Sequence, residues 1–328
     1  MKILITGAFG NIGKAVIEEA CKRQHEIVVF EVSNKKTRKT AIKYRSKAQV
    51  IFGDIRQLDT LQAAVEQADA VIHLAAIIPP ASKKNRITTL DINYNGTQNL
   101  VNVIKTTRPG IPFVFTSSAS VMGPTQHQNP PVNRNDSLVG TGNYEESKIK
   151  CETYLRENAD NYLIFRLAGV LPTFSTSTLM DSFSLLEELF DMHPDMRLEM
   201  VTAQDIAVAL IVGAEKLKTN TTPKNQAYIL GGGQENGWQL RGDKFLARLF
   251  SALSLPVPDR KYFTPNINTY HLDWYDTNEA QQEFHYQNHT FNDYLKQVKK
   301  TFRFYRLPIK LLRRYLLTRL VKMSPYQP

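Results

Sequence analysis

The chain has 328 residues with a formal net charge of +10, and its content of 42% hydrophobic and 22% charged residues is ordinary for a globular protein of one large or two small domains. With two cysteines and seven scattered histidines, neither a disulfide framework nor a metal site is expected. No apolar run reaches the ~20 residues of a membrane-spanning helix. The opening apolar run comes too early for a signal peptide, so a cytoplasmic protein is expected.

Short apolar strands alternate with helical segments through the first half of the chain. Strands are predicted at 2–6, 26–30, 50–52, 70–74, 112–116 and 162–166, and helices at 13–22, 58–68, 90–106 and 144–158. Near-continuous apolar strands separated by helices are typical of a parallel sheet that is covered on both faces. The predicted fold class is therefore α/β, a doubly wound parallel sheet (Rossmann) with a smaller C-terminal substrate-binding lobe.

The pattern becomes less regular after the sixth strand. A strand end that runs into a helix is predicted at 201–216, a strand at 227–230, and helices near 240–254 and 290–302. No internal repeat and no long linker marks a second independent domain. We therefore predict a dinucleotide-binding core over 1–170 to which 201–232 returns, a substrate-binding lobe from 171–200 and 233–300, and a basic tail over 301–328.

A glycine-rich turn follows the first strand directly and opens a helix. Gly7 permits the tight turn, Gly10 lets the backbone approach a pyrophosphate, and Gly13 lets the helix pack closely on the strand. Asn11 and Ile12 begin the helix, whose free N–H groups favour an anion. Spaced glycines with a strand before them and a helix after them predict a dinucleotide site.

Glu31 lies at the end of the second strand, about 20 residues after the turn. A carboxylate at this point accepts hydrogen bonds from the adenosine ribose hydroxyls and repels a 2′-phosphate. NAD is therefore the predicted cofactor and NADP is less favoured. The basic residues Lys35, Lys36 and Arg38 follow closely and weaken this preference.

Tyr144 and Lys148 lie four residues apart, on one face of a predicted helix. A free Tyr has a pKa near ~10 and is a poor acid or base at neutral pH. A neighbouring ammonium and an oxidised nicotinamide both favour the phenolate, so we expect the pKa of Tyr144 to be lowered. A serine-rich segment with Ser117, Ser118 and Ser120 lies at the end of the fifth strand, where doubly wound sheets place their sites. A hydroxyl there can bond the substrate oxygen that Tyr144 protonates.

Together these motifs resemble the extended short-chain dehydrogenases/reductases, in their NAD-dependent epimerase/dehydratase family, over roughly residues 1–300. The further matches are Gly53-Asp54-Ile55, His73-Leu74-Ala75-Ala76, Asn93-x-x-Gly96-Thr97, Arg166-Leu167-Ala168-Gly169-Val170 and Asp205-Ile206-Ala207. The resemblance implies that Tyr144 is the general acid/base, that Lys148 lowers its pKa and binds the nicotinamide ribose, and that Ser118 orients the substrate oxygen.

The resemblance also implies further cofactor contacts. Asp54 and Ile55 are expected at the adenine, the loop Leu74, Ala75 and Ala76 along the pyrophosphate and ribose, and Val170 near the nicotinamide. Asn93 is expected among the cofactor-binding residues. Many relatives are homodimers through the helices that correspond to 90–106 and 144–158, so a homodimer is expected.

The chain departs from the family pattern at positions that bear on the substrate. Sugar dehydratases carry an Asp-Glu pair where this chain has Ala119 and Ser120, so dehydration is not expected. Nucleotide-sugar epimerases usually have Asn and Tyr where this chain has Gly169 and Met122. Arg197 is one position out of register with the Arg that such enzymes direct at the diphosphate.

Three hypotheses about function follow. In the first, an NAD-dependent oxidoreductase or epimerase moves hydride at a hydroxyl-bearing carbon of a small molecule, such as a (nucleotide-)sugar. In the second, an NAD(P)-dependent alcohol dehydrogenase or ketoreductase acts on a less polar substrate. The third is a non-enzymatic dinucleotide-sensing binder, against which the complete set of Ser118, Tyr144 and Lys148 argues.

The C-terminal end, residues 294–328, carries ten basic residues and no acidic residue. Its charge of +10 equals the net charge of the whole chain. The body is therefore close to neutral, and nucleic acid is not expected as a partner. A helix with one apolar face is predicted after Pro308. That face consists of Ile309, Leu312, Tyr315, Leu316, Leu320 and Met323, and Arg319 interrupts it. Two interpretations stay open: the tail lies on an anionic membrane surface, or it packs on the lobe or on a partner subunit.

Overall fold

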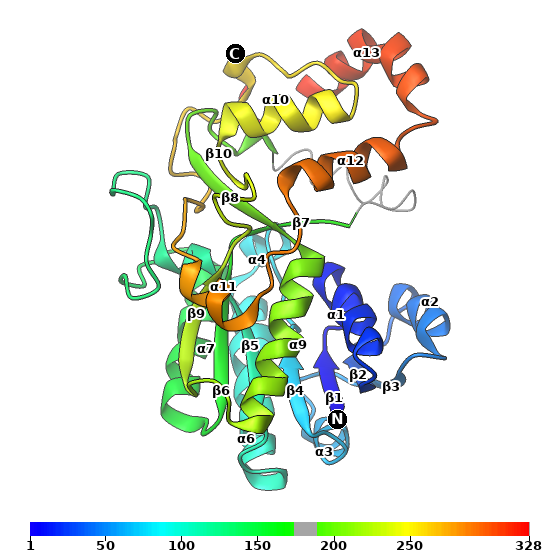
Figure 1. Cartoon of the computed structure of the whole chain (residues 1–328), viewed down its shortest axis with the longest axis vertical. Helices are drawn as coiled ribbons and strands as arrows, with labels where there is room; N and C mark the ends of the chain where they lie inside the picture. Colours follow the sequence, from blue (N-terminus) through cyan, green and yellow to red (C-terminus); the bar gives the residue numbers. More distant parts are fainter. Residues whose placement is uncertain (174–188, 328) are drawn as a thin grey trace.

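Seven parallel strands form the central sheet of the molecule (Figure 1). The structure, a computed structural model, describes residues 1–173 and 189–327. The strands, in chain order, are β1 (Lys2–Thr6), β2 (Glu26–Glu31), β3 (Gln49–Phe52), β4 (Ala70–His73), β5 (Phe113–Ser118), β6 (Tyr162–Leu167) and β9 (Gln226–Leu230). They are arranged in the order β3-β2-β1-β4-β5-β6-β9, which confirms the predicted doubly wound α/β fold.

Helices cover both faces of this sheet because alternate side chains of each strand point to opposite faces. Ile3 and Ile5 of β1 pack in one core with α1 (Asn11–Lys22) and α9 (Ala203–Thr219). Leu4 packs in a second core on the other face. The helices of that face are α3 (Leu58–Val65), α6 (Gly96–Thr107) and α7 (Asn143–Asn158).

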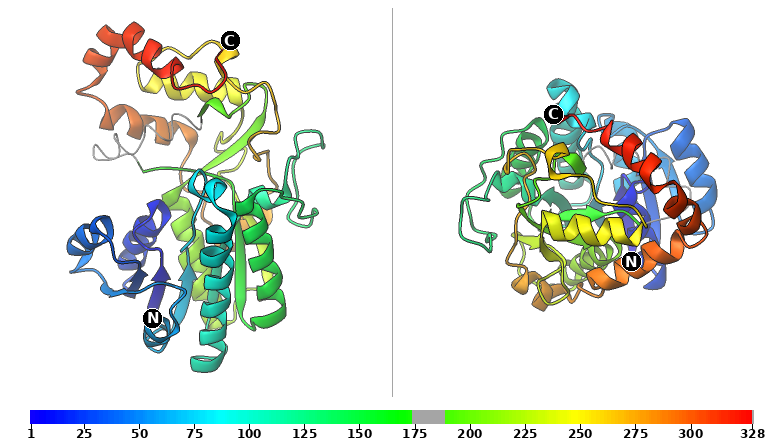
Figure 2. Two further views of the ribbon diagram at one scale, coloured as in Figure 1. Left: turned by 180° about the vertical axis from the view of Figure 1, so that it is seen from behind. Right: turned by 90° about the horizontal axis from the view of Figure 1, so that it is seen from above.

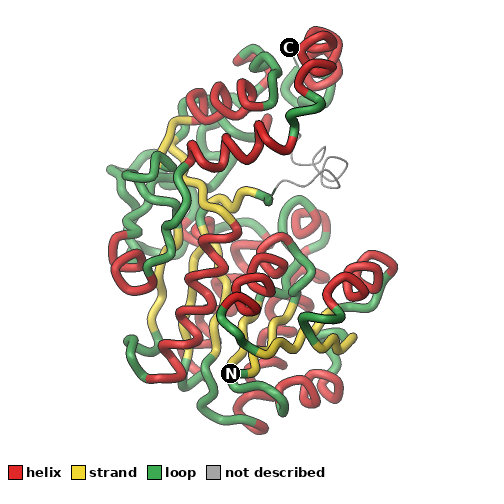
Figure 3. Tube along the Cα trace, turned by 45° about the vertical axis from the view of Figure 1, so that its right-hand side comes forward, coloured by secondary structure: helices red, strands yellow, loops and turns green. Residues whose placement is uncertain are grey.

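A smaller lobe lies above the carboxyl ends of these strands (Figures 2 and 3). Its three-stranded sheet contains β7 (Gly169–Leu171), β8 (Arg197–Thr202) and β10 (Gln239–Arg241). A separate core, which includes Trp238 and Phe245, joins this sheet to the helices of the lobe. Those helices are α10 (Gly242–Ala252), α12 (Phe291–Thr301) and α13 (Arg306–Val321). Residues 174–188 of the predicted lobe lie outside the described residues.

The chain crosses between the two parts more than once. The strand end predicted at residue 201 is part of β8, which begins at Arg197 and pairs with β7 and β10 and not with the central sheet. From β8 the chain returns through α9 to β9, the last strand of the central sheet. The helix α11 (Asn278–Phe284) packs on α9 and on β9. The lobe is therefore built from segments inserted between elements of the core.

Three helical features differ from the sequence-based expectation. The helix α2 (Lys35–Tyr44) was not predicted, and its only buried residue is Thr37. The helix predicted at 90–106 is divided into α5 (Arg86–Leu90), a π-helical turn (Asp91–Asn95) and α6, preceded by the short α4 (Ala81–Lys84). Finally, α13 begins before Pro308 and not after it, because the first turn of a helix tolerates a proline that lacks an N–H group.

Two further observations concern the cysteines and the length of the helices. Cys21 and Cys151 are both free thiols. Throughout residues 1–173 and 189–327, the helices are too short or too polar for any of them to span a membrane.

Candidate active site

A cleft of about 1600 Å³ runs along the carboxyl ends of the central strands and under the lobe. It exceeds the roughly 300–1000 Å³ of an ordinary small-molecule site, so it has room for a dinucleotide and a second ligand. All but one of the predicted site residues line it. These are Gly7, Gly10, Asn11, Ile12, Gly13, Glu31, Asp54, Ile55, Leu74, Ala75, Ala76, Ser118, Tyr144, Lys148 and Val170.

The turn between β1 and α1 has the geometry of a phosphate cradle. Gly7 has φ of +68°, and a Cβ added there would lie 2.7 Å from the Cα of Ala75. A Cβ on Gly13 would lie 2.4 Å from the carbonyl oxygen of Ala8. Gly10 is the N-cap of α1 and provides no side-chain cap for its N–H groups. Glycines therefore keep the turn tight, and the helix N-terminus faces the cleft with donors for an anion.

Glu31 is fixed at the end of β2 by two backbone hydrogen bonds. Its carboxylate accepts them from the N–H groups of Phe9, at 3.2 Å, and Val32, at 3.0 Å. Burial raises the pKa of Glu31, against the lowering effect of these two bonds. Of the nearby basic residues, Lys36 lines the cleft, whereas Arg38 bonds Ser33 and lies over the ring of Phe52.

A buried polar relay fixes the loop that follows β4. The ring of His73 lies between the hydroxyls of Thr6, at 2.6 Å, and Thr97, at 2.9 Å. Thr6 Oγ1 also accepts hydrogen bonds from the N–H groups of Leu74 and Ala75. Burial lowers the pKa of His73 to about 3, so this imidazole is neutral and serves as a structural link. The relay places the Leu74–Ala76 segment along the cleft.

Asp54 and Asn93 both have structural partners. Asp54 lines the cleft, and its carboxylate accepts from Arg56 Nη2 at 2.6 Å, which lowers the pKa of Asp54. Asn93 is the predicted site residue that does not line the cleft. Its side chain is buried behind the wall, where it bonds both backbone groups of Ile77 and donates to Ser147 Oγ at 3.0 Å. It therefore supports the wall from behind.

Ser118, Tyr144 and Lys148 come together where β5 ends beside the first turns of α7. Lys148 is 4% exposed, and its Nζ donates to the carbonyl oxygen of Thr116 at 2.7 Å. The same Nζ lies 5.8 Å from the centre of the Tyr144 ring. The hydroxyl of Ser118 lies near Tyr144 and acts on the pKa of the phenol, and Ser118 Oγ lies 2.9 Å from Ser120 Oγ. A phenol, an ammonium and a hydroxyl thus share one wall of the cleft.

Burial controls the ionisation of this group more than its neighbours do. It lowers the pKa of Lys148 to about 8. It also raises the pKa of Tyr144 well above the ordinary value, assisted by the charge of Glu145 and opposed by the side chain of Ser118. The expected lowering of the Tyr144 pKa is therefore absent in the protein alone, because desolvation of the phenolate is the largest effect on this group.

The wall opposite the glycine turn contains polar residues that sequence reasoning did not single out. Glu145, Lys83, Asp191 and His271 all line the cleft, and Lys83 Nζ lies 4.0 Å from Asp191 Oδ2. Burial lowers the pKa of His271 against the opposing effect of Glu145. Glu145 could have been noticed because it follows Tyr144 directly. The others come from loops and short segments that carry no motif.

Arg197 faces away from the cleft into a closed network. Its Nε and Nη2 bond the two carboxylate oxygens of Asp273, at 2.6 and 2.9 Å, and Nη2 also donates to the carbonyl oxygens of Thr125, Gln126 and Gln128. Asp273 is fully buried. No arginine stands among the described residues that line the cleft. The guanidinium of Arg197 is therefore already committed to structural contacts.

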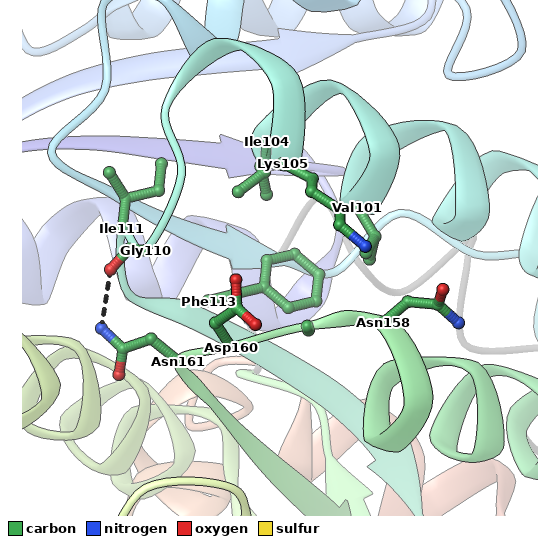
Figure 4. A pocket seen from close by; sticks show the side chains of 10 residues that line it. Val101, Ile104, Lys105, Gly110, Ile111, Phe113, Asn158, Asp160 and Asn161 are labelled. Atoms are coloured by element: carbon green, nitrogen blue, oxygen red, sulfur yellow. Dashed lines mark hydrogen bonds between the residues drawn. The ribbon is translucent and has the colours of Figure 1, made fainter.

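A second hollow lies at the opposite, amino end of β5 (Figure 4). Its volume of about 20 Å³ is enough for a single water molecule. Asn161 Nδ2 donates to the carbonyl oxygen of Gly110 across its edge at 2.9 Å. The hollow is too small for a substrate, so the large cleft is the candidate active site.

Comparisons with known proteins identify the family and the fold. Residues 3–176 match the NAD dependent epimerase/dehydratase family. The fold is similar to that of a UDP-glucose 4-epimerase from Stenotrophomonas maltophila with bound NAD and formylated UDP-arabinopyranose, with a TM-score of 0.76 and 18% identity over 94% of this chain and 99% of that one.

Two other solved structures are similar to the same extent. A UDP-glucose 4-epimerase from Thermotoga maritima, with UDP-glucose, has a TM-score of 0.73 and 17% identity over 93% of this chain and 99% of that one. A dTDP-glucose 4,6-dehydratase double mutant from Streptomyces venezuelae, with NAD bound, has a TM-score of 0.74 and 19% identity over 94% of this chain and 100% of that one. At these identities the likeness concerns the fold.

Proposed function

Because the chain belongs to the NAD-dependent epimerase/dehydratase family, we propose that it is an NAD-dependent oxidoreductase or epimerase that moves hydride at a hydroxyl-bearing carbon of a small molecule. The observation that carries this proposal is the meeting of Ser118, Tyr144 and Lys148 in the cleft that the glycine turn also lines. A dinucleotide cradle and a phenol–ammonium pair in one cleft suit proton and hydride transfer at the same carbon.

The cleft fits NAD at the glycine turn, at the start of α1 and at Glu31. The turn at Gly7 and Gly13 leaves no room for a Cβ, the first turn of α1 has uncapped N–H groups, and Glu31 is held as a ribose acceptor. When bound, NAD supplies the hydride acceptor and, in the reverse direction, the hydride donor.

The proton moves between the substrate hydroxyl and the Tyr144 hydroxyl. Ser118 holds the substrate oxygen, because it lines the same cleft as Tyr144 and its hydroxyl acts on the phenol. Lys148 Nζ is anchored by the Thr116 carbonyl and keeps a positive charge beside the phenol ring. Since burial disfavours the phenolate, this cation supports the charged form of Tyr144 during the transfer.

Dehydration is not part of the proposal. At the two positions after Ser118, where sugar dehydratases carry an acid pair, Ala119 is buried and Ser120 bonds Ser118. Neither side chain can exchange a proton at neutral pH. The two positions after Ser118 therefore lack the acid pair on which elimination depends, whereas Tyr144 suffices for oxidation or epimerisation.

A specific observation favours the second candidate, an alcohol dehydrogenase or ketoreductase acting on a less polar substrate. The solved relatives carry UDP-linked sugars, and a diphosphate needs cations, most often arginine forks. Here Arg197 is committed to Asp273. Lys83, on the wall opposite the glycine turn, has the carboxylate of Asp191 4.0 Å away. The sequence 174–188 contributes three acidic residues and no Lys, Arg or His.

A paired substrate screen tests the function and separates its two forms. Purified full-length protein is supplied with NAD and either UDP-sugars or alcohols and free sugars without a diphosphate, and NADH absorbance and epimer formation are followed. We expect NADH production from a compound that lacks the diphosphate. Turnover of a UDP-sugar with cofactor retained on the enzyme would support the epimerase instead, and no oxidoreduction in any arm would contradict both.

We also propose that the protein forms a homodimer through α6 and α7. The proposal rests on the position of these two helices side by side on one face of the central sheet. Sedimentation analysis of the purified protein tests it.

A further inference from the structure

An exposed apolar stripe, for which the proposed function has no use, lies along α13 and the turn before it. Five large apolar side chains there are more than half exposed: Phe304 at 75%, Leu307 at 68%, Leu311 at 76%, Leu312 at 54% and Tyr315 at 57%. Soluble proteins rarely leave several such side chains together without a partner. The stripe therefore calls for a surface that covers it.

The stripe forms one continuous face of the helix. Leu307, Leu311 and Tyr315 follow each other at intervals of four residues, which places them one above the other. Pro308 and Leu312 lie beside them at the next positions and are also exposed. An apolar stripe of this length on a helix is suited to contact with a flat apolar layer.

A different face of α13 holds the helix on the lobe. Leu320 is buried, and Ile309 and Met323 pack against the lobe core. This corrects the sequence-based prediction of a single apolar face, since Leu312 and Tyr315 point to solvent and Ile309 and Leu320 point inward. Arg319 lies on the exposed side of the helix, where its Nε donates to the hydroxyl of Tyr315 at 3.1 Å and its guanidinium lies over the Tyr315 ring.

Basic residues border the stripe. Arg306, Lys310 and Arg314 each precede an apolar residue of the stripe, and Arg303 and Arg313 lie close to it in sequence. No acidic residue occurs in 294–328. Within the part of the chain that the structure describes, no ion pair involves a basic residue between Arg303 and Lys322. The positive charges are thus available to an external anion.

The basic helix α2 shows that charge alone does not create such a face. It carries five basic residues, but its large exposed apolar side chain is Ile42 alone, at 65%. The combination of an apolar stripe and bordering cations distinguishes α13 from α2. The two helices therefore offer a matched comparison within one chain.

We infer that α13 docks the protein on an anionic membrane surface, with the stripe inserted among the lipid headgroups and the bordering cations on the phosphates. The helix is at the outer end of the lobe, away from the central sheet (Figures 1 and 2). It lies in the plane of the surface and does not cross it. No residue of α13 lines the active-site cleft, so the cleft is not part of the docking face.

Charge decides between a lipid surface and a second copy of the chain. In a two-fold contact the same patch meets itself, so the cations that border one stripe would face those of the other. Like charges oppose that contact, whereas they are attracted by anionic lipids. The membrane surface is therefore the occupant that the charges favour.

Vesicle sedimentation of the full-length protein tests the inference. Vesicles of phosphatidylcholine alone are compared with vesicles that also contain phosphatidylglycerol. We expect binding to the second kind, and release at molar salt, where charges are screened within about 3 Å. Because each basic residue near an anionic surface contributes about fivefold in affinity, the variant K310Q/R313Q/R314Q should bind about a hundredfold more weakly. L311S should also weaken binding.

The matched control is K39Q/K43Q/R45Q, which removes three exposed positive charges at α2 and should bind as the unmodified protein does. Thermal unfolding checks that all variants fold. Equal binding by the α13 and α2 variants, or no preference for anionic vesicles, would overturn the inference. A dimer that L311S converts to a monomer, with vesicle binding unchanged, would assign the stripe to a contact between copies and overturn it as well.

Discussion

At the scale of single residues, burial sets the charge states on which the site depends. Lys148 has its pKa lowered to about 8, while an unfolded lysine titrates near 10.5. The folded protein therefore binds fewer protons at this group than the unfolded chain does between these two values. Stability rises with pH wherever the unfolded state binds more protons.

A stability measurement against pH tests this assignment. The free energy of unfolding of the unmodified protein should rise relative to that of K148M between pH 8 and pH 10.5, the interval bounded by the two pKa values, by on the order of 1.4 kcal/mol for each pH unit. Below pH 8 the difference should be constant. Urea unfolding of both proteins at several pH values measures it, and a difference that does not change with pH would contradict the burial of a titrating ammonium.

Glu31 should decide the choice between NAD and NADP. Replacement by serine removes the carboxylate that Phe9 and Val32 hold at the end of β2. Since hydrogen bonds to a charged group contribute about 1.5–3 kcal/mol, the affinity for NAD should fall about tenfold to a hundredfold, and NADP should bind better than before. Fluorescence titration with both cofactors checks this. If E31S kept the same selectivity between NAD and NADP, then Lys36 or the backbone near it, and not Glu31, would determine that selectivity.

At the scale of elements, the β1–α1 turn separates two roles of glycine. A Cβ at position 13 would press on the backbone of Ala8 at 2.4 Å, which cannot move without shifting α1. A Cβ at position 10 would meet its nearest neighbour, the Gly7 oxygen, at 3.4 Å and would point to the cleft that Gly10 lines. G13A should therefore lower the free energy of unfolding by about 3 kcal/mol. G10A should keep stability and lose NAD affinity.

Thermal unfolding measures the stability of G10A and G13A, and titration with NAD measures their cofactor affinity. The pair is informative because each variant controls for the other. Loss of stability in G10A, or normal stability in G13A, would show that the helix does not pack on the strand as described.

Elements with strong local patterns could be predicted from the sequence, and those defined by long-range contacts could not. The runs at Ile3 and Val28 are apolar without interruption, which fits only strands buried on both faces. By contrast, α2 was missed because only Thr37 is buried in it, so the helix has no buried apolar face that a pattern could reveal. The three-residue strands β7 and β10 depend on pairing with β8 and have little signal of their own.

At the scale of the whole molecule, the site too has parts that follow from local sequence patterns and parts that follow from long-range contacts. The cofactor side is made by consecutive motifs around Gly7, Ser118 and Tyr144, so sequence reasoning could place it. Other residues that line the cleft, such as Asp191 and His271, are far apart in the sequence and reach the same cleft only in the folded chain. Nothing in their local sequence marks them.

Arg197 connects the lobe to the loop over 125–128 and should matter for stability. Replacing it by methionine would leave the fully buried Asp273 without its cation. Removing one partner of a buried pair costs about 3–5 kcal/mol, and a value near the lower end is expected because Arg197 is partly exposed. R197M should melt at a lower temperature with NAD affinity unchanged. If the variant instead kept its stability and lost binding of UDP measured by calorimetry, Arg197 would be a diphosphate ligand and the second candidate substrate class would be wrong.

The proposed function depends most on the proton transfer assigned to Tyr144, and replacing Tyr144 by phenylalanine tests this transfer directly. The change removes one oxygen from a side chain that lines the cleft, so Y144F should fold and bind NAD as before. With the substrate found by the paired screen, its kcat should fall by about 10²–10⁴-fold, the usual contribution of a general acid/base. A Y144F enzyme that turns over at the rate of the unmodified protein would contradict the proposed chemistry.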